Sequence, residues 1–158
     1  MADEALQLRP SDAGRYHDVR MASAGAEALV FAATYVPLGS RVAIKVLRPE
    51  IAGTVGPDRF LREIRIAARL SHPHIVPLLA SGQAQQFLYY VMPFVEGDSL
   101  RALLGREGQL SVEATARITR EVAAAIGYAH TQGVVHRDIK PENIMLSGGV
   151  AVVTDFGI

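Results

Sequence analysis

One polar segment late in the chain constrains the fold more than any other stretch of the sequence. It reads His136-Arg137-Asp138-Ile139-Lys140-Pro141-Glu142-Asn143, and short apolar runs at 133–135 and 144–146 lie on either side of it. A second polar triplet, Asp155-Phe156-Gly157, follows an apolar run and begins twelve residues after Asn143 (155 − 143). Polar loops between apolar segments are typical of a rigid scaffold that presents reactive side chains. We therefore expect these two loops to carry the chemistry of the protein.

The side chains of the two loops suit the transfer of a phosphoryl group to an alcohol. That reaction needs a carboxylate that positions the hydroxyl and accepts its proton, a cation near the transferring group, and metal ions on the phosphates. Asp138 is the candidate base and Lys140 the candidate cation, while Asn143 and Asp155 supply oxygen ligands of the kind that Mg²⁺ prefers. Taken singly, an aspartate in a loop is more often a turn former and an asparagine a cap, so the argument depends on their joint spacing.

This spacing matches the catalytic loop H-R-D-x-x-x-x-N and the D-F-G triplet of protein kinases. On these motifs the chain resembles a protein kinase, and it is most similar to the eukaryotic-type, or Hanks-type, serine/threonine protein kinases of bacteria. The resemblance covers residues 16–158. It implies an α+β fold of the two-lobe, protein kinase-like kind that uses ATP and Mg²⁺.

The resemblance also implies a division into domains. A leader is expected at 1–15, an N-lobe with a five-stranded antiparallel sheet and one helix at 16–92, a hinge at 93–98, and part of a helical C-lobe at 99–158. A whole kinase domain would need on the order of a hundred further residues, since single domains commonly run well past this length. We therefore expect a complete N-lobe and an incomplete C-lobe, truncated just after the D-F-G triplet.

Composition narrows the classes of partner. Lysine plus arginine and aspartate plus glutamate number 16 each, so net charge gives no reason to expect nucleic acid or a membrane surface. The sequence has no cysteine, which excludes disulfides and thiolate metal sites and fits a reducing cytoplasm. No apolar run approaches the roughly 18 residues of a membrane-spanning helix, and the N-terminus does not resemble a signal peptide. By resemblance, the partners are ATP and protein substrates with serine or threonine acceptors.

Residues 23–30 align with the family's glycine-rich loop, G-x-G-x-x-G-x-V. Only Gly25 keeps its glycine, because Ser23 and Ala28 stand at the other two positions. Glycine in such a loop lets backbone N–H groups approach phosphate oxygens closely, so the departure leaves the strength of phosphate binding open. Val30 stands fifteen residues before Lys45 (45 − 30), which is the register that the family requires of its second and third strands.

The segment Val42-Ala43-Ile44-Lys45 matches the V-A-I-K strand of the family. With the alternation of a strand, Ala43 and Lys45 face the same side. A helix is predicted over 57–70, and Glu63 borders its apolar stripe. The resemblance makes Glu63 the partner that holds Lys45 against the α- and β-phosphates. The alternative is a surface ion pair with Arg59 or Arg62, which would stabilise little.

Residues 93–98 have the composition of a linker, and an extended linker can offer adenine a backbone donor and acceptor. By resemblance, Met92 is the gatekeeper and Val95 supplies the backbone N–H and C=O. Val30 and Ala43 would cover one face of the adenine and Met145 the other. All of these residues are also ordinary core residues, so their assignment to a nucleotide site rests on the resemblance.

Local signals predict the remaining strands. Three strands are expected between residues 16 and 46, and an uncharged run at 87–92 is expected to be a central fifth strand. Residues 71–79 are expected to lead into the fourth strand, with a hairpin turn at Gly82–Gln86. The proline turn between His72 and His74 is more typical of a structural turn than of a metal site.

Two helices are predicted in the second half of the chain. A short one is expected from Ser99 to Arg106, and Ser111 is expected to cap a long one that reaches about Thr131. Gly133 is expected to end the long helix.

Two functions remain open from the sequence. The first is an ATP-dependent serine/threonine protein kinase, which the segment 140–142 favours over a tyrosine kinase by resemblance. The alternative is a truncated, catalytically incompetent kinase-like module that binds nucleotide or a partner without transferring phosphate.

Overall fold

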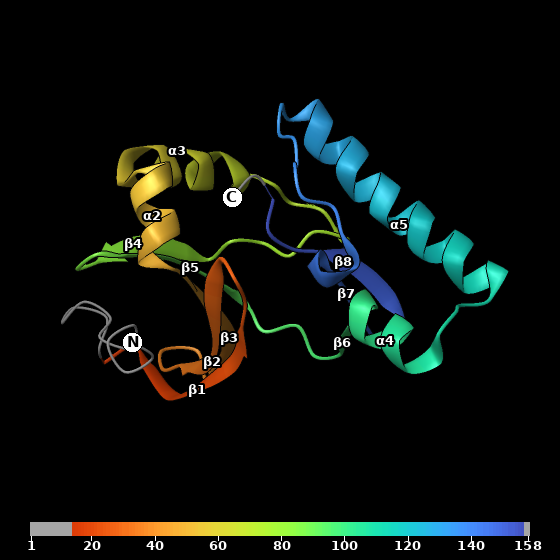
Figure 1. Ribbon diagram of the computed structural model, residues 1–158, viewed down its shortest axis with the longest axis horizontal. Coiled ribbons are helices and arrows are strands. Elements are labelled where there is room, and N and C mark those ends of the chain that lie inside the picture. The colour runs from red at the N-terminus through yellow and green to blue at the C-terminus, as the bar shows by residue number, and fades with distance from the viewer. Residues whose placement is uncertain (1–13, 157–158) are drawn as a thin grey trace. The chain divides into compact units, whose positions relative to one another are not determined.

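The computed structural model describes residues 14–156, apart from the side chain of Val55 (Figure 1). Most of the expected leader and Gly157 of the D-F-G triplet therefore lie outside the described residues. Contacts divide the chain into two compact units. The first unit comprises residues up to Ile64 together with Leu78–Phe94, and the second comprises Arg65–Pro77 together with the residues from Val95 onward.

The first unit contains the five-stranded antiparallel sheet that the resemblance implied. Its strands are β1 (Tyr16–Ala24), β2 (Ala28–Tyr35), β3 (Ser40–Leu47), β4 (Ala80–Ala84) and β5 (Phe87–Pro93), and their order is β1-β2-β3-β5-β4. The uncharged strand β5 pairs with β3 on one side and β4 on the other, as its composition predicted. Strands without charge are typical of such interior positions because both of their faces are covered.

One face of this sheet carries the hydrophobic core of the first unit. The alternation of β3 puts Val42, Ile44 and Val46 on that face, and Ala43 and Lys45 on the other. The buried side chains of the core come from four strands: Phe31, Ala33, Val42, Ile44, Val46, Ala84, Phe87, Tyr89 and Val91. Burial of one face thereby fixes the register, because a shift by one residue would turn Lys45 into the core.

Two helices follow β3. The helix α2 (Pro49–Val55) was not predicted, although Pro49 at its first position and Glu50 in its first turn are typical start signals. The helix α3 (Pro57–Ala67) ends three residues before the predicted Leu70. After Ala67 the backbone makes three-residue turn bonds, from Arg69 N to Ile66 O and from Leu70 N to Ala67 O. The last residues of the predicted helix therefore form a turn.

The predicted hairpin turn at Gly82–Gln86 was too long. The strand β4 includes Gly82, which pairs with Tyr89, and the turn itself contains only Gln85 and Gln86. A Cβ atom on Gly82 would lie 2.8 Å from the hydroxyl of Tyr89. Gly82 therefore provides room for an aromatic side chain on the neighbouring strand and does not form the turn.

The second unit combines two helices with a small sheet. The helices are α4 (Leu100–Glu107) and α5 (Val112–Thr131), and the sheet contains β6 (Asp98–Ser99), β7 (Ile144–Ser147) and β8 (Val150–Val153). Ser111 caps α5 as predicted, since its hydroxyl accepts a hydrogen bond of 3.1 Å from Ala114 N. Ser99, which was predicted as the first residue of the short helix, is the cap of α4, and its hydroxyl accepts from Ala102 N at 3.1 Å. The long helix α5 packs on β8, and its buried side chains recur at helical spacing: Ile118, Val122, Ala125 and Ala129.

The segment 65–77, expected in the N-lobe, groups with the second unit because it is hydrogen-bonded to β8. Val76 N donates to Val153 O at 2.9 Å, and Val153 N donates to His74 O at 2.8 Å. The ring of His74 contacts the same strand, with Nδ1 2.8 Å from Ala151 O, while His72 Nδ1 accepts from His74 N at 3.1 Å. His72 thus binds backbone within the turn, and His74 links the turn to β8.

Across residues 14–156, no helix has the length and apolar character that a membrane span requires.

Gly97, which directly precedes β6, should be the position in this segment where a substitution lowers stability most. It has φ 131°, and a Cβ atom there would collide with Leu146 O on β7. Because strain and overpacking add, Gly97→Ala is expected to lower the free energy of unfolding by roughly 2–4 kcal/mol. The matched variant Gly105→Ala lies within α4 with no atom near its Cβ, so better helix propensity should stabilise the protein by up to about 1 kcal/mol. Thermal unfolding followed by circular dichroism checks both signs, and equal effects would contradict the prediction.

Candidate active site

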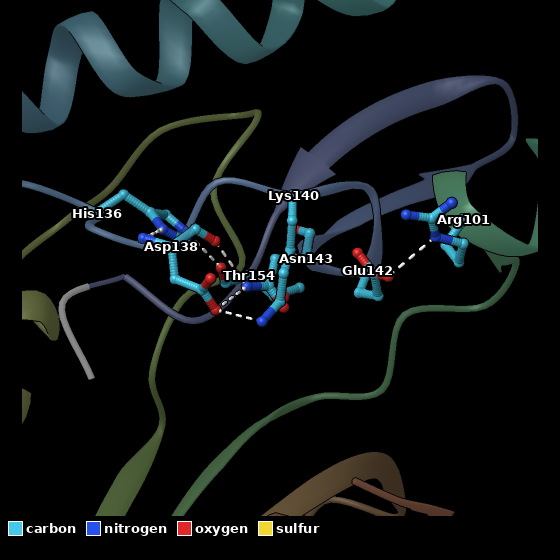
Figure 2. Close-up of polar contacts among 7 residues, drawn as sticks. All are labelled: Arg101, His136, Asp138, Lys140, Glu142, Asn143 and Thr154. Carbon is cyan, nitrogen blue, oxygen red and sulfur yellow. Dashed lines mark hydrogen bonds and ion pairs between the residues drawn. The ribbon is translucent and has the colours of Figure 1, made fainter. Parts of the chain in front are cut away.

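His136 connects the catalytic-loop segment to the residues after β8. Its ring is buried, with 2% of the residue exposed, and its Nε2 donates to Thr154 O at 2.7 Å. Its Nδ1 accepts from Asp138 N at 3.2 Å (Figure 2). The two bonds require a neutral imidazole with its proton on Nε2. The ring also packs edge-on against Phe156, with the ring centroids 4.6 Å apart.

Asn143 holds Asp138 in place and, through its backbone, reaches the same threonine. Its Nδ2 donates to Asp138 O at 2.8 Å and to Asp138 Oδ2 at 3.0 Å, as Figure 2 shows. Its carbonyl oxygen accepts from Thr154 N at 2.9 Å. Only 7% of Asn143 is exposed. Since the amide nitrogen is committed to Asp138, Oδ1 is the atom of this side chain that can bind a cation.

The carboxylate of Asp138 lies beside a cation. Lys140 Nζ is 2.7 Å from Asp138 Oδ2, and half of the Asp138 side chain is exposed. The hydrogen bond from Lys140 is the main reason that the pKa of Asp138 lies below its usual value. Desolvation acts in the opposite direction, and the hydrogen bond from Asn143 adds to the lowering. Asp138 is therefore ionised at neutral pH, as a proton acceptor must be.

Two residues of the site have backbone conformations that side chains rarely adopt. Arg137 has φ 72° and Asp155 has φ 66°, both in the left-handed region. Such conformations cost of order 1–3 kcal/mol each and occur where surrounding contacts enforce them, often at functional sites. Here the bonds to His136 and Asn143 hold the residues next to both positions.

The structure places the predicted site residues in two groups. In the second unit Asp138, Lys140 and Asn143 contact one another, and Asp155 directly follows the threonine that Asn143 binds. The other predicted residues of the second unit are Val95, just after the hinge begins, and Met145 on β7.

In the first unit, strand register gathers predicted nucleotide-binding residues on one face of the sheet. Val30 pairs directly with Lys45, and Ala43 pairs with Met92. Residues directly opposite in antiparallel strands share a face, so these four do, together with Ala28 two residues before Val30. Ser23 and Gly25 lie at the end of β1 and in the turn after it. The convergence of the two groups on one nucleotide stays a prediction.

Glu63 forms the alternative pair with Arg59. Arg59 Nε lies 3.0 Å from Glu63 Oε1, one helical turn away. Lys45 lies next to Tyr90, with Nζ 5.8 Å from the ring centroid. The pairing of Lys45 with Glu63 stays a prediction.

Sequence reasoning missed two contacts that support the loop. Thr154 joins His136 and Asn143, and its only sequence signal is its position directly before the D-F-G triplet. Glu142, on the short helix η1 (Pro141–Asn143), pairs with Arg101 on α4 at 2.9 Å (Figure 2). Its own backbone N–H, and next Arg101, lower the pKa of Glu142. No local signal predicts this pair, because its members are 41 residues apart.

His136 should make the protein sensitive to mild acid. Burial lowers its pKa, although the Thr154 carbonyl and the nearby carboxylates act in the opposite direction. The unfolded chain therefore takes up a proton near the ordinary value of about 6.5, while the folded chain does so only at lower pH. The stability that depends on neutral His136 is thus present above about pH 6.5 and is lost as the pH falls below it.

The test compares thermal unfolding at about pH 7.5 and about pH 5.5. His136→Gln should show a smaller loss of Tm on acidification than the wild type, from a lower starting value. His130→Gln, at an exposed position on α5, should keep the wild-type slope. If His136→Gln lost as much Tm between the two pH values as the wild type does, His136 would not be the cause of the acid sensitivity.

The comparisons with known proteins agree with this geometry. The family described as "Protein kinase domain" matches residues 16–158. The chain is 40% identical to the probable serine/threonine-protein kinase pknA2 of Bifidobacterium longum, over 92% of this chain and 20% of the relative. It is 39% identical to the serine/threonine-protein kinase PrkC of Bacillus subtilis, over 92% of this chain and 23% of the relative. The chain thus spans about a fifth of the length of these curated relatives.

Solved structures have the same fold. The kinase domain of PknI from Mycobacterium tuberculosis is similar with a TM-score of 0.77 and 32% identity, covering 90% of this chain and 61% of that one. Rad53 in complex with AMP-PNP is similar with a TM-score of 0.79 and 30% identity, covering 90% of this chain and 38% of that one. With the catalytic-loop contacts and the five-stranded sheet in place, the match over residues 16–158 shows that the chain belongs to the protein kinase domain family.

Proposed function

We propose that the chain provides the nucleotide-binding sheet and the catalytic loop of an ATP-dependent serine/threonine protein kinase. One observation carries the proposal: Asn143 holds an ionised Asp138 through its side chain and Thr154 through its backbone. A base and two oxygen ligands for a cation are thereby bound into one network. Membership of the kinase family supports the reaction class.

Asp138 is the proposed proton acceptor. As the oxygen of a serine or threonine hydroxyl forms a bond to the γ-phosphorus, the bond from that phosphorus to the β–γ bridging oxygen breaks and ADP leaves. The hydroxyl proton passes to the Asp138 carboxylate, which Asn143 orients. Lys140 keeps this carboxylate ionised and places a positive charge beside the reacting groups.

Asn143 and Asp155 are the proposed ligands of Mg²⁺. The amide of Asn143 is oriented so that Oδ1 is its remaining ligand atom, and an asparagine with one carboxylate suits Mg²⁺, which usually takes few protein ligands beside phosphates and water. Bound there, Mg²⁺ would neutralise charge on the β- and γ-phosphates.

Several observations support ATP as the phosphoryl donor. The sheet face with Val30, Ala43 and Met92 offers apolar surface for a base, and Lys45 lies on the same face. The similar Rad53 structure is a complex with AMP-PNP. The relatives named as serine/threonine kinases, together with the segment 140–142, favour serine and threonine as acceptors.

Transfer should depend on Asp138 far more than nucleotide binding does. With the full product of the gene, we expect Asp138→Asn to lower phosphate transfer to casein by about 10²- to 10⁴-fold, because general-base catalysis is lost. Its Mg–ATP affinity should stay within about threefold of the wild type, since the substitution removes no phosphate ligand. Radioactive transfer from ATP and isothermal titration calorimetry measure the two quantities.

Two further variants separate the possible outcomes. Lys45→Met should weaken Mg–ATP binding, while Asp18→Asn on exposed β1 should change neither quantity. Nucleotide binding without any transfer in the wild type would leave the catalytically incompetent nucleotide-binding module as the function. No response to ATP and Mg²⁺ would overturn both readings.

A further inference from the structure

The turn between β1 and β2 is held by a residue from outside it. This turn, residues 25–27, is the tip of the segment that aligns with the glycine-rich loop. Arg48 follows β3, and its Nε donates to Gly25 O at 2.9 Å. Its backbone N donates to Glu27 O at 3.0 Å. One residue therefore binds both ends of the turn, and all of these residues lie in the first unit.

The carbonyls of Gly25 and Glu27 accept hydrogen bonds from Arg48, while the N–H groups of Ala26 and Glu27 point to no backbone carbonyl among the described residues. Gly25 N donates to Ala28 O at 2.9 Å and closes the turn. Among the described residues, no backbone carbonyl accepts from the N–H of Ala26 or Glu27. Consecutive backbone N–H groups in an exposed turn form a concave donor site for an anion. Such a site requires that these N–H groups be held in a fixed orientation.

Arg48 supplies this orientation through the geometry of the peptide bond. The peptide between Gly25 and Ala26 is planar and trans, so its carbonyl and its N–H point in opposite directions. By holding Gly25 O, the guanidinium also directs Ala26 N–H away from itself. This restraint matters because glycine is the residue whose peptide rotates most freely, and Gly25 is the one glycine that the loop retains.

We propose that Arg48 is a positioning residue for the phosphates of the nucleoside triphosphate, because it preorganises Ala26 N–H through the carbonyl of Gly25. The proposal rests on the proposed function and on the alignment of this loop with the family's glycine-rich loop. Preorganised donors cost less conformational entropy on binding. Loss of the contact should therefore reduce affinity for the triphosphate and leave affinity for the nucleoside unchanged.

Three substitutions at position 48 separate the hydrogen bond from the charge. In Arg48→Gln, the side-chain amide nitrogen is an uncharged donor, and it is separated from the backbone by the same number of bonds as Nε of arginine. Arg48→Met has a similar length and no donor. Arg48→Lys keeps a charge, yet has a carbon atom where Nε stands. The backbone bond to Glu27 is available in all three variants, so they differ only in what reaches Gly25.

Binding of Mg–ATP and of adenosine is measured by isothermal titration calorimetry for the wild type and each variant. Arg48→Met and Arg48→Lys should weaken Mg–ATP binding by about 5- to 10-fold, the equivalent of one hydrogen bond of about 1 kcal/mol or slightly more. Arg48→Gln should stay within about twofold of the wild type, and adenosine affinity should not change in any variant. Wild-type Mg–ATP affinity in Arg48→Met would overturn the proposal. Wild-type Mg–ATP affinity in Arg48→Lys but not in Arg48→Gln would also overturn it, because the charge would then act on the phosphates directly. An equal loss of affinity for adenosine and for Mg–ATP would overturn it as well.

A second measurement does not depend on nucleotide. Without ligand, hydrogen exchange of the turn should be faster in Arg48→Met than in the wild type and Arg48→Gln, and equal rates would overturn the proposal. A wild-type protein that binds neither Mg–ATP nor adenosine would instead count against the proposed function, whatever the exchange rates show.

Discussion

The second unit depends on the hydrogen bonds that hold the backbone of Thr154 from both sides. Its N–H donates to the carbonyl of Asn143, and its own carbonyl accepts from the buried ring of His136. Both partners also bind Asp138, one at its backbone N–H and the other at its carboxylate. The proposed base and the proposed metal ligand Asp155 are therefore tied to a single threonine. Because His136, Asn143 and Thr154 are buried, their polar groups would be costly to leave without a partner.

These constraints explain how the chain can maintain unfavourable backbone conformations at two positions. Arg137 and Asp155 have positive φ, and each lies beside a residue held by this network. The burial of His136 against Phe156 adds packing to the hydrogen bonds. The helix α5 also holds β8, since Glu121 Oε2 on α5 accepts a hydrogen bond from Ala151 N on β8 at 2.7 Å. The catalytic loop is thus presented by a small sheet with a long helix packed on it, which matches the expectation of a rigid scaffold.

Much of this arrangement could be predicted, because kinase motifs and caps are local signals. The five strands of the first sheet, the serine cap of α5 and the types of residue that surround Asp138 all followed from short stretches of sequence. The predictions were wrong where the role of a residue depends on a contact with another part of the chain. Gly82 was interpreted as a turn residue, whereas it makes room for Tyr89. No local signal predicted the hydrogen bonds between the segment 65–77 and β8, which group this segment with the second unit.

By itself, the sequence identified the family and predicted the kind of chemistry, because residue types at fixed spacing carry that information. It also determined which faces of the strands are apolar, since alternation is a property of the chain. Only the tertiary structure decided that Thr154 links His136 to Asn143, that Arg101 pairs with Glu142, and that Arg48 binds Gly25. The physical reason is that a hydrogen bond depends on distance and direction in space. Residues that lie tens of positions apart meet only after strand register and helix packing have placed them.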